Sequence, residues 1–511
     1  MKQFILKYHL YGLLLLLCAF FIFKATTFPV HDFANYYFGA KFLSDGNFNT
    51  SIYFPYEFNK GISDLGFQNI FVSFAPNTPF LAVFFLPFTL VSVVKAKIFF
   101  NIISSFLLIF SCYRLFDFYK INIRYVILIP LLFFVPIKNN LLFGQVYFLL
   151  FFLLSEGLIA YEKQQFKKMS LFLSLAIFLK VFPILFALIF VFKKQFKPLL
   201  YTIISCVLLL GISILFTGID IWIFFFKNVL PKASNGEIAT SFVDNYQSVF
   251  MFLKRLLLFN STENYTVLFS SLLLSFKFLL VLIGFYITKK NLNNLYVFSY
   301  WILASYLISP YGSTYGFILM FFVLISILKS SISNVQKIGF LILLFLINNL
   351  PVSFFIENNF PFSYLRLFAL TMLFIAFIVQ IHKSVNWKIV IPVSILPLIL
   401  VLLNEPKIIN SELFSKENFP ILVYDYKISN NQLTYFYWNE NGENKDSIPT
   451  NSTENEELIL KYNQIYYKNN QVTFDKSNKL KPTLINHKTI LFLSDYDRGI
   501  GFYTFRKITI H

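Results

Sequence analysis

The amino-acid sequence predicts an all-α polytopic membrane protein with a small β-rich domain at its C-terminal end. The first observation is composition: 57% of the 511 residues are apolar and 13% are charged, against about 25% charged in soluble domains. The second is a series of long apolar runs from Leu10 to about residue 403. The third is that Lys and Arg gather in the short segments between these runs, as in the cytoplasmic loops of membrane proteins.

The apolar runs are the expected membrane helices. The first extends from Leu10 to about Phe28, after Lys2 and Lys7, and is near the ~20 residues that cross a bilayer as a helix. A signal peptide would have a shorter apolar core and a cleavage site of small residues. We therefore expect an uncleaved first helix with a cytoplasmic N-terminus. Later runs lie at roughly 79–94, 97–116, 125–138, 146–160, 169–192, 198–216, 265–287, 294–310, 315–329, 338–351, 365–382 and 388–403.

The basic clusters between the runs determine the expected topology, because Lys and Arg favour the cytoplasmic side. Counting every run as one span places these clusters on both sides. Two changes bring them all inside. The 79–94 run, which contains two prolines, is expected to be re-entrant or interfacial, and the 169–192 run to be two short helices broken near Lys180 and Pro183. About 12–13 transmembrane helices result.

This topology predicts two domains, a transmembrane domain over 1–403 and an extracytoplasmic β-rich domain over 404–511. The second is polar and holds 13 basic and 13 acidic residues, so the net charge of +18 belongs to the first. Basic residues in short loops, with no basic stripe, argue against nucleic-acid binding. Turn signals separate strand-like runs in the second domain: Leu433–Trp438, Gln464–Tyr467, Gln471–Phe474, Ile490–Leu493 and Gly501–Ile508, with turns at Asn439–Gly442 and Lys468–Asn470.

The expected chemistry is extracytoplasmic. The cytoplasmic loops are too short for a nucleotide-binding domain, and the sequence contains no P-loop or GxGxxG motif. The large connecting segments, 30–96, 217–264 and the tail, all fall outside. The three cysteines have no CxxC spacing and the five histidines are scattered, so the sequence predicts no metal site, disulfide framework or cofactor.

Asp32 is the first candidate for chemistry, because it follows the first predicted span and would lie at the membrane surface. It also opens an amphipathic helical pattern that Gly46 closes. Asp32 is a capping residue for that helix in the simplest interpretation, in which its side-chain oxygen accepts a backbone N–H. A single surface carboxylate can also act as a general base, and the two roles are compatible.

Lys180 is the second candidate, since it stands in an apolar stretch three residues before Pro183. An ionisable residue at such a place suggests a functional site, whereas a lysine that snorkels to the surface is the structural alternative. Further candidates are residues able to bind phosphate or a polar ligand in the outer segments. They are Arg255 and Arg366 for phosphate, and Tyr36, Tyr37, Gln145, Asn245, Gln247 and Tyr315 for substrate. Anchoring to lipid headgroups is an equal alternative for Arg255, and for most first-loop aromatics an interfacial aromatic belt is the favoured interpretation.

Six short motifs follow one another along the chain: Asp32–Gly46, Phe74–Pro79, Gly144–Gln145, Leu179–Pro183, Asn245–Ser248 and Ser309–Pro310. In the same order, they resemble motifs of glycosyltransferase family 87 of the GT-C superfamily. The resemblance covers about residues 10–330 and leaves the tail outside. One difference concerns the stretch after Ser309–Pro310, where related members often carry a histidine and this chain reads Tyr311 to Tyr315 without one.

This resemblance implies an integral membrane glycosyltransferase with a GT-C-like fold. It implies Asp32 as the catalytic base and Lys180 as a ligand of the donor phosphate. The implied donor is a polyprenyl-phosphate hexose, with mannose as the family expectation, and the acceptor is a hydroxyl of a glycolipid or glycan. Because a phosphate leaving group needs little proton donation, the expected reaction is a single displacement with inversion.

A lipid-linked-sugar flippase or other transporter is the main alternative, since it would also be polytopic with broken helices. Transporters usually show repeated halves with matching interruptions, and the sequence has no second copy of the Lys-x-x-Pro break. A purely structural protein leaves Lys180 unexplained. Abundant Asn, Lys and Phe suggest an AT-rich bacterial genome, and hence a protein of the bacterial inner membrane. We expect a multi-pass monomer surrounded by lipid, with its C-terminal domain outside.

Overall fold

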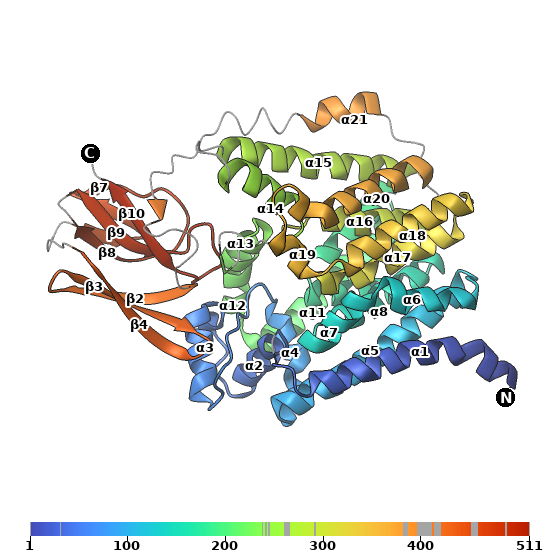
Figure 1. Cartoon of the computed structure of the whole chain (residues 1–511), viewed down its shortest axis with the longest axis horizontal. Helices are drawn as coiled ribbons and strands as arrows, with labels where there is room; N and C mark the ends of the chain where they lie inside the picture. Colours follow the sequence, from blue (N-terminus) through green and yellow to red (C-terminus); the bar gives the residue numbers. More distant parts are fainter. Residues whose placement is uncertain are drawn as a thin grey trace. The chain divides into compact units, whose positions relative to one another are not determined.

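The computed structural model describes residues 2–30, 32–237, 239–240, 243, 246–259, 266–290, 293–381, 387–395, 411–412, 421–450, 458–485 and 488–509. These residues are mostly helical up to Ser394 and form short strands from Ser411 onwards (Figure 1). The sequence prediction of a largely helical protein with a β-rich end is therefore confirmed. The chain forms two compact units. The first comprises Met1–Phe33, Val83–Phe216 and Phe242–Asn404, and the second Ala34–Ala82, Thr217–Ser241 and Glu405–His511.

The first unit contains most of the helices. Their apolar sequences leave few polar side chains to satisfy, and helical hydrogen bonding satisfies the backbone. In chain order the elements are α1 (Lys2–Ala25), η2 (Leu86–Leu90), α5 (Val93–Phe118), η3 (Ile123–Ile127), α6 (Leu128–Leu132), α7 (Phe134–Phe143), α8 (Tyr147–Glu162), α9 (Phe166–Leu179), η4 (Phe182–Phe186), α10 (Ala187–Phe192), α11 (Phe196–Thr217), α14 (Val249–Lys254), η6 (Arg255–Phe259), α15 (Thr266–Lys290), α16 (Asn294–Ile308), η7 (Thr314–Met320), α17 (Phe321–Lys329), α18 (Asn334–Asn349), α19 (Val352–Glu357), η8 (Phe362–Tyr364), α20 (Leu365–Ile381) and α21 (Trp387–Ser394).

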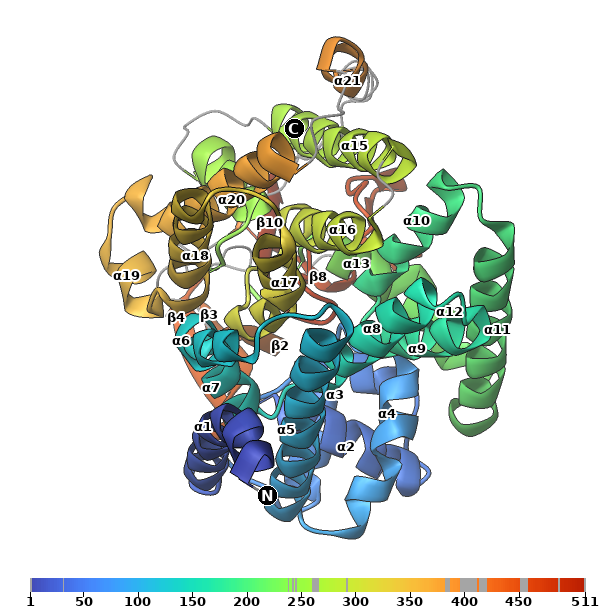
Figure 2. The same cartoon turned by 90° about the vertical axis from the view of Figure 1, so that its right-hand side faces the viewer.

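The core of the first unit lies along η7 and α17. Every residue from Gly316 to Ile327 is buried, as expected of a segment that is apolar on all sides. Elements α8, α16 and α18 pack against this segment (Figure 2). By contrast, α11 exposes a largely apolar surface, with Leu215 86% exposed, which suits contact with lipid.

Four helices among the described residues are long and apolar enough to cross a membrane: Val93–Phe118, Phe196–Thr217, Val267–Lys290 and Phe362–Gln380. A fifth candidate arises if Ile123–Leu132 and Phe134–Phe143, which meet at a 64° bend, count as one span. Other apolar helices in this part of the chain have 10–17 residues, shorter than the ~20 that span a bilayer unaided. A polytopic membrane protein is supported, while the larger number of 12–13 spans stays a prediction.

The predicted helix break near Lys180 is confirmed. Helix α9 ends at Leu179, Lys180 is extended with φ −146° and ψ 127°, and a short 3₁₀ turn begins at Phe182. Pro183 lies in the first turn of that element, where its missing N–H costs no hydrogen bond. The 79–94 run is also broken, into α4 (Pro79–Phe85) and η2, and its apolar helical stretch ends at Leu90.

The second unit combines the first large connecting segment, part of the second and the tail. Its helices are α2 (Phe33–Ser44, shared at its first residue with the first unit), η1 (Thr50–Tyr53), α3 (Pro55–Asp64), α4 (shared with the first unit from Val83 on), α12 (Ile219–Phe224), the π-helix η5 (Phe225–Val229) and α13 (Leu230–Ser234). Its strands are β1 (Ser411–Glu412), β2 (Leu422–Ser429), β3 (Gln432–Asn439), β4 (Gly442–Pro449), β5 (Leu458–Lys461), β6 (Gln464–Tyr467), β7 (Asn470–Gln471), β8 (Lys479–Ile485), β9 (Thr489–Ser494) and β10 (Thr504–Thr509).

Three antiparallel sheets form the β-rich part, with orders β1-β10-β9-β8, β2-β3-β4 and β5-β6-β7. Strand β9 is buried on both faces, because successive side chains of a strand point to opposite sides. Leu491 and Leu493 join the cluster that includes β2 and β3, whereas Ile490 and Phe492 join the cluster around Ile465 of β6. The four-stranded sheet therefore lies between the two smaller sheets.

Four of the five predicted strands are confirmed, as β3, β6, β9 and β10, and both predicted turns join consecutive strands. Gln471–Phe474 was expected to be a strand, but β7 covers only Asn470–Gln471, with one further backbone bond from the N–H of Val472 to the carbonyl of Ile465 over 2.9 Å. Beyond Gln471 the side chain of Thr473 accepts the N–H of Ile465, 2.8 Å away, where a continuing strand would use its backbone. The sequence analysis did not predict β4 and β8, because polar residues interrupt the apolar pattern of both segments.

The tail packs with the connecting segments inside the second unit. The ring of Tyr56 in α3 stacks on Tyr424 of β2, with centroids 3.9 Å apart. The ammonium of Lys232 in α13 lies 3.1 Å from a carboxylate oxygen of Asp495, which is fully buried. The predicted boundary between 403 and 404 remains a prediction about domains, and these contacts show that residues after it fold together with residues far before it.

Candidate active site

Asp32 lies where the chain leaves α1 and enters α2. Helix α2 begins at Phe33 and ends at Ser44, and Gly46 adopts φ +75°, so the predicted helix and its glycine stop are confirmed. Asp32 therefore occupies the position directly before the first helical residue, where capping residues stand. Its side chain is half-buried, which leaves it within reach of both protein and solvent.

The side chain of Gln145 holds the Asp32 carboxylate. The Nε2 of Gln145 donates a hydrogen bond to Oδ2 of Asp32 over 2.6 Å, and Gln145 is only 4% exposed. A hydrogen bond to an ionised acceptor is shorter and stronger than one between neutral groups. The structure thus brings together two residues that the sequence nominated separately, and it fixes the orientation of the carboxylate.

Gly144 allows this approach, because it permits both a left-handed backbone and a close contact. It ends α7 with φ +68°, and a Cβ built on it would lie 2.7 Å from Cβ of Phe33. Only glycine adopts that backbone without strain and leaves room for the neighbour. The backbone N–H of Gln145 then donates to the carbonyl of Asn140 over 2.9 Å, which directs the side chain of Gln145 towards Asp32.

Lys180 interacts electrostatically with the Asp32 carboxylate. Its extended backbone in the break after α9 turns the half-buried side chain towards α8, where Nζ lies 6.0 Å from the ring centroid of Tyr147. A cation over the face of an aromatic ring is stabilised by the ring quadrupole. The carboxylate and the ammonium, nominated by the sequence as base and phosphate ligand, therefore lie in the same unit and near enough to attract each other.

Three tyrosines, Tyr147, Tyr246 and Tyr315, lie in the neighbourhood of Asp32. Tyr147 begins α8, Tyr246 precedes α14, and Tyr315 lies in η7. The rings of Tyr147 and Tyr315 have centroids 5.3 Å apart, and Ser313 lies close to both Tyr246 and Tyr315. Of these, the sequence analysis nominated only Tyr315. Tyr147 stands two residues after Gln145, and Tyr246 inside the Asn245–Ser248 motif, so proximity to those motifs was the available signal.

Hydrogen bonds between loops hold the tyrosine-bearing segments in place. Oγ of Ser248 donates to the carbonyl of Pro310 over 2.8 Å, and Nδ2 of Asn140 donates to the carbonyl of Tyr315 over 2.8 Å. Gln247 is 2% exposed, and its Nε2 donates to the carbonyl of Ser363 over 2.9 Å. In this structure Gln247 links two segments of the protein, and its role as a substrate ligand stays a prediction.

The two arginines predicted to bind phosphate have aromatic surroundings. Arg366 is 1% exposed, donates to the carbonyl of Leu350 over 2.6 Å, and lies 4.4 Å from the ring centroid of Phe355. The guanidinium of Arg255, at the start of η6, lies 6.0 Å from the ring centroid of Phe360. The structure records protein contacts for both, and phosphate binding by either stays a prediction.

The remaining nominated residues lie elsewhere. Tyr36 and Tyr37 belong to the second unit and are 1% and 5% exposed, with the ring of Tyr37 packed on Phe38 at 5.2 Å. Asn245 falls outside the described residues. The described residues contain no group of three or more His, Cys, Asp and Glu able to hold a metal ion.

Sequence analysis missed Lys97 because this residue opens a predicted membrane run. It lies in α5, is 1% exposed, and its Nζ donates to the carbonyl of Pro29 over 2.7 Å. Like Lys180, it interacts electrostatically with Asp32. The signal available in the sequence was a lysine at the start of a predicted apolar helix.

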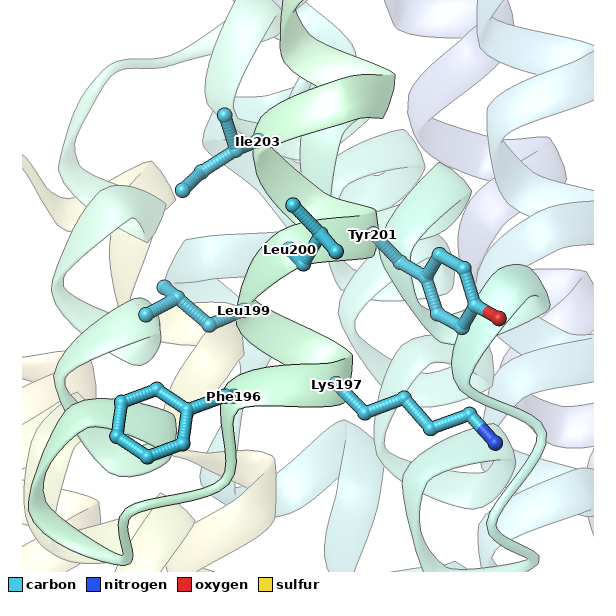
Figure 3. Close-up of a pocket in the computed structure, with 6 residues that line it drawn as sticks. All are labelled: Phe196, Lys197, Leu199, Leu200, Tyr201 and Ile203. Carbon is cyan, nitrogen blue, oxygen red and sulfur yellow. The ribbon is translucent and has the colours of Figure 1, made fainter.

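The surface of α11 also carries a shallow depression, and Figure 3 shows the residues that line it. Most of its lining is aliphatic or aromatic, and α11 is one of the candidate spans, so it suits contact with lipid acyl chains. The lining residues are Phe196, Lys197, Leu199, Leu200, Tyr201 and Ile203.

Comparison with known proteins gives a family match over part of the chain. The family model of glycosyltransferase family 87 matches residues 74–310, which confirms the resemblance drawn from the short motifs. The matched part contains Gln145, Lys180 and Ser309–Pro310, whereas Asp32 lies ahead of it. No curated protein and no solved structure gives a match.

Proposed function

We propose, from the premise that residues 74–310 match glycosyltransferase family 87, that this protein transfers a hexose from a polyprenyl-phosphate donor to an acceptor hydroxyl on the extracytoplasmic face. The family supports glycosyltransferase activity, and the candidate spans support a membrane protein. The observation that carries the finer proposal is the cluster of Asp32, Gln145 and Lys180, which joins a fixed carboxylate to an ammonium.

Asp32 is the general base in this proposal. The proton of the acceptor hydroxyl passes to the Asp32 carboxylate while the acceptor oxygen bonds to the anomeric carbon. The bond between that carbon and the phosphate oxygen breaks, and its electron pair leaves with the phosphate. Attack opposite the leaving group inverts the anomeric centre, as in inverting glycosidases. The hydrogen bond from Gln145 supports this role, because a base must be held in a defined orientation.

Lys180 stabilises the negative charge on the departing polyprenyl phosphate in the same proposal. A cation fixed before the reaction lowers the barrier without reorganisation, and loss of one such group costs about 3 kcal/mol at comparable sites. The helix break supports this role, because it presents Lys180 at the end of α9 and outside any helical ladder. Arg255 and Arg366 are proposed as secondary phosphate ligands.

The tyrosine cluster supports a sugar-binding role for this part of the site. Aromatic rings stack on the apolar faces of sugars, while phenol hydroxyls hydrogen-bond to sugar hydroxyls. Tyr315 stands in the stretch where related members often carry a histidine, and with Tyr147 and Tyr246 it supplies hydroxyl groups there. We propose Gln145, Asn245, Gln247, Tyr36 and Tyr37 as further substrate contacts, and mannose, the family expectation, as the sugar.

The proposed location is a bacterial inner membrane, with a cytoplasmic N-terminus and an extracytoplasmic C-terminal domain. The basic clusters between the apolar runs support this orientation. The proposed partners are the polyprenyl-phosphate sugar, a glycolipid or glycan acceptor, and membrane lipid around a monomer.

Transfer by the purified protein tests the proposal. The protein in lipid nanodiscs is incubated with radiolabelled polyprenyl-phosphate hexoses and bacterial glycolipids, and labelled product is measured. Asp32→Asn is expected to abolish turnover, by at least about a hundredfold for loss of a general base, yet to bind the donor as wild type does. Asp45→Asn, which changes an exposed carboxylate just beyond the other end of α2, is the matched control. A wild-type protein that moves lipid-linked sugars across the vesicle membrane without forming labelled product would instead be a flippase.

A further inference from the structure

A single face of α5 supports the chain on both sides of Asp32. Lys97 contacts the carbonyl of Pro29, three residues before Asp32. One turn further along the same face, the ring of Phe100 packs on Phe33, the residue after Asp32, at a centroid distance of 5.8 Å. Residues three apart on a helix share a face, so α5 holds the Asp32 segment from both ends.

The burial of Lys97 is unusual enough to need a cause. Lys97 is 1% exposed, whereas Lys95, two residues earlier in the same helix, is exposed. Burying an ammonium costs several kcal/mol unless partners compensate, so a lysine with only a structural role has little reason to occupy this position. The partners here are the carbonyl of Pro29, 2.7 Å away, and the ring of Phe28, 5.4 Å away.

The carbonyl that Lys97 contacts is available because the chain is not helical there. Helix α1 ends at Ala25 and α2 begins at Phe33. Within this connection the N–H of Phe33 donates to the carbonyl of Val30 over 3.2 Å, so the chain turns tightly just before Asp32. Anchoring Pro29, the residue next to that turn, therefore restricts the backbone from which the Asp32 side chain extends.

The charge of Lys97 adds to this anchoring. Lys97 and Lys180 both interact electrostatically with Asp32, although they come from elements far apart in the sequence. Gln145 meanwhile holds the carboxylate itself. Three side chains thus act on Asp32. Gln145 donates a hydrogen bond to its carboxylate, Lys180 attracts it from the helix break, and Lys97 binds the backbone three residues before it.

We propose that Lys97 is a positioning residue that holds the Pro29–Asp32 segment, and with it the base, in the geometry needed for glycosyl transfer. This inference rests on the proposed function of Asp32. It differs from the role proposed for Lys180, because Lys97 acts on the protein backbone and not on the donor phosphate. It predicts a loss of turnover without a loss of donor affinity.

Steady-state kinetics of Lys97→Met test this role, with Lys95→Met as the matched control on the same helix. Loss of a hydrogen bond to a charged group corresponds to about a 10- to 100-fold fall in kcat, with the donor KM within about twofold of wild type by the same reasoning. Lys95→Met is expected to match wild type. Lys97→Arg, which keeps the charge and a donor, is expected to recover part of the lost kcat.

Three outcomes would overturn the proposal. A donor KM that rises with an unchanged kcat would make Lys97 a phosphate ligand. Full kcat per folded molecule, with a lower thermal midpoint, would make Lys97 merely structural. If Lys97→Met does not fold, Lys97→Gln takes its place, and wild-type kcat in a folded Lys97→Gln protein whose residues 26–33 exchange faster than in wild type would contradict the proposal.

Hydrogen exchange separates this inference from the proposed function. In the full-length protein, the amides of residues 26–33 are expected to exchange at least about tenfold faster in Lys97→Met than in wild type, because an anchor of their segment is lost. Lys95→Met is expected to leave them unchanged. If the wild-type protein transfers no sugar, the proposed function fails, while this exchange result still decides whether Lys97 holds the segment.

Discussion

At the scale of residues, the site depends on how closely the backbone at residue 144 approaches Asp32. Gln145 reaches the carboxylate because Gly144 adopts a left-handed conformation and packs without a side chain against Phe33. The sequence singled out Gly144 and Gln145 only as a small residue beside an amide. The contact itself was not predictable, because it joins segments more than a hundred residues apart through a space that only a glycine leaves open.

Gly144→Ala is therefore expected to disturb the site. The added Cβ would meet Phe33 at 2.7 Å, at a backbone φ of +68° that alanine tolerates poorly. Strain of this kind costs roughly 1–3 kcal/mol, so a lower thermal midpoint and weaker transfer are expected in a purified sample. Gly157→Ala is the matched control, since its nearest neighbour would lie at an ordinary 3.7 Å. Equal midpoints for the two variants would contradict this explanation.

At the scale of elements, the helix break after α9 was predictable and several other breaks were not. A lysine and a proline inside an apolar run gave two independent reasons to interrupt the helix at Lys180, and the structure confirms the interruption. The bend between α6 and α7 has only part of that signal, because Pro136 follows Phe133 by three residues but no ionisable residue stands at the break. Phe133 lies between the two helices with φ −119° and ψ 25°, inside a sequence that periodicity treats as one continuous helix.

Strands show the same division. Runs of apolar and aromatic residues identified β3, β9 and β10, because each strand packs against one or both hydrophobic clusters. Strand β4 pairs with β3 along its whole length, yet its sequence, Gly442–Pro449, is mostly exposed and polar. Pairing to a neighbour stabilises it in place of burial, and a single sequence carries little trace of that partnership.

At the scale of the whole molecule, the second unit assembles segments that the sequence analysis treated as separate loops. Charge attraction explains one contact that joins them, because Lys232 in the 217–264 segment and Asp495 in the tail carry opposite charges. Nothing in one sequence pairs two such residues, so the expected domain limits, 1–403 and 404–511, followed composition alone. Burial by itself would lower the pKa of Lys232, but the carboxylates of Asp495 and Glu237 outweigh burial and raise it.

Lys232→Met is accordingly expected to loosen the second unit. Its ammonium also donates to the carbonyl oxygens of Asp495 and Arg498, each 3.0 Å away, and removing it would leave the buried Asp495 carboxylate without its cation. Breaking a buried pair in this way costs about 3–5 kcal/mol. Limited proteolysis of the tail measures the effect, with Lys227→Met, an exposed lysine in η5, as control. Unchanged protection in Lys232→Met would mean that the pair does not stabilise the unit.

The most direct measurement of the central claim is thiol labelling of positions 32 and 180 from each side of the membrane. Asp32→Cys and Lys180→Cys are introduced singly into a chain whose three native cysteines are replaced by alanine, and a membrane-impermeant maleimide is applied to oriented vesicles. Both positions are expected to react from the extracytoplasmic side, and a polyprenyl-phosphate hexose is expected to protect both. Reaction of the two positions from opposite sides would contradict a shared site for the base and the phosphate ligand.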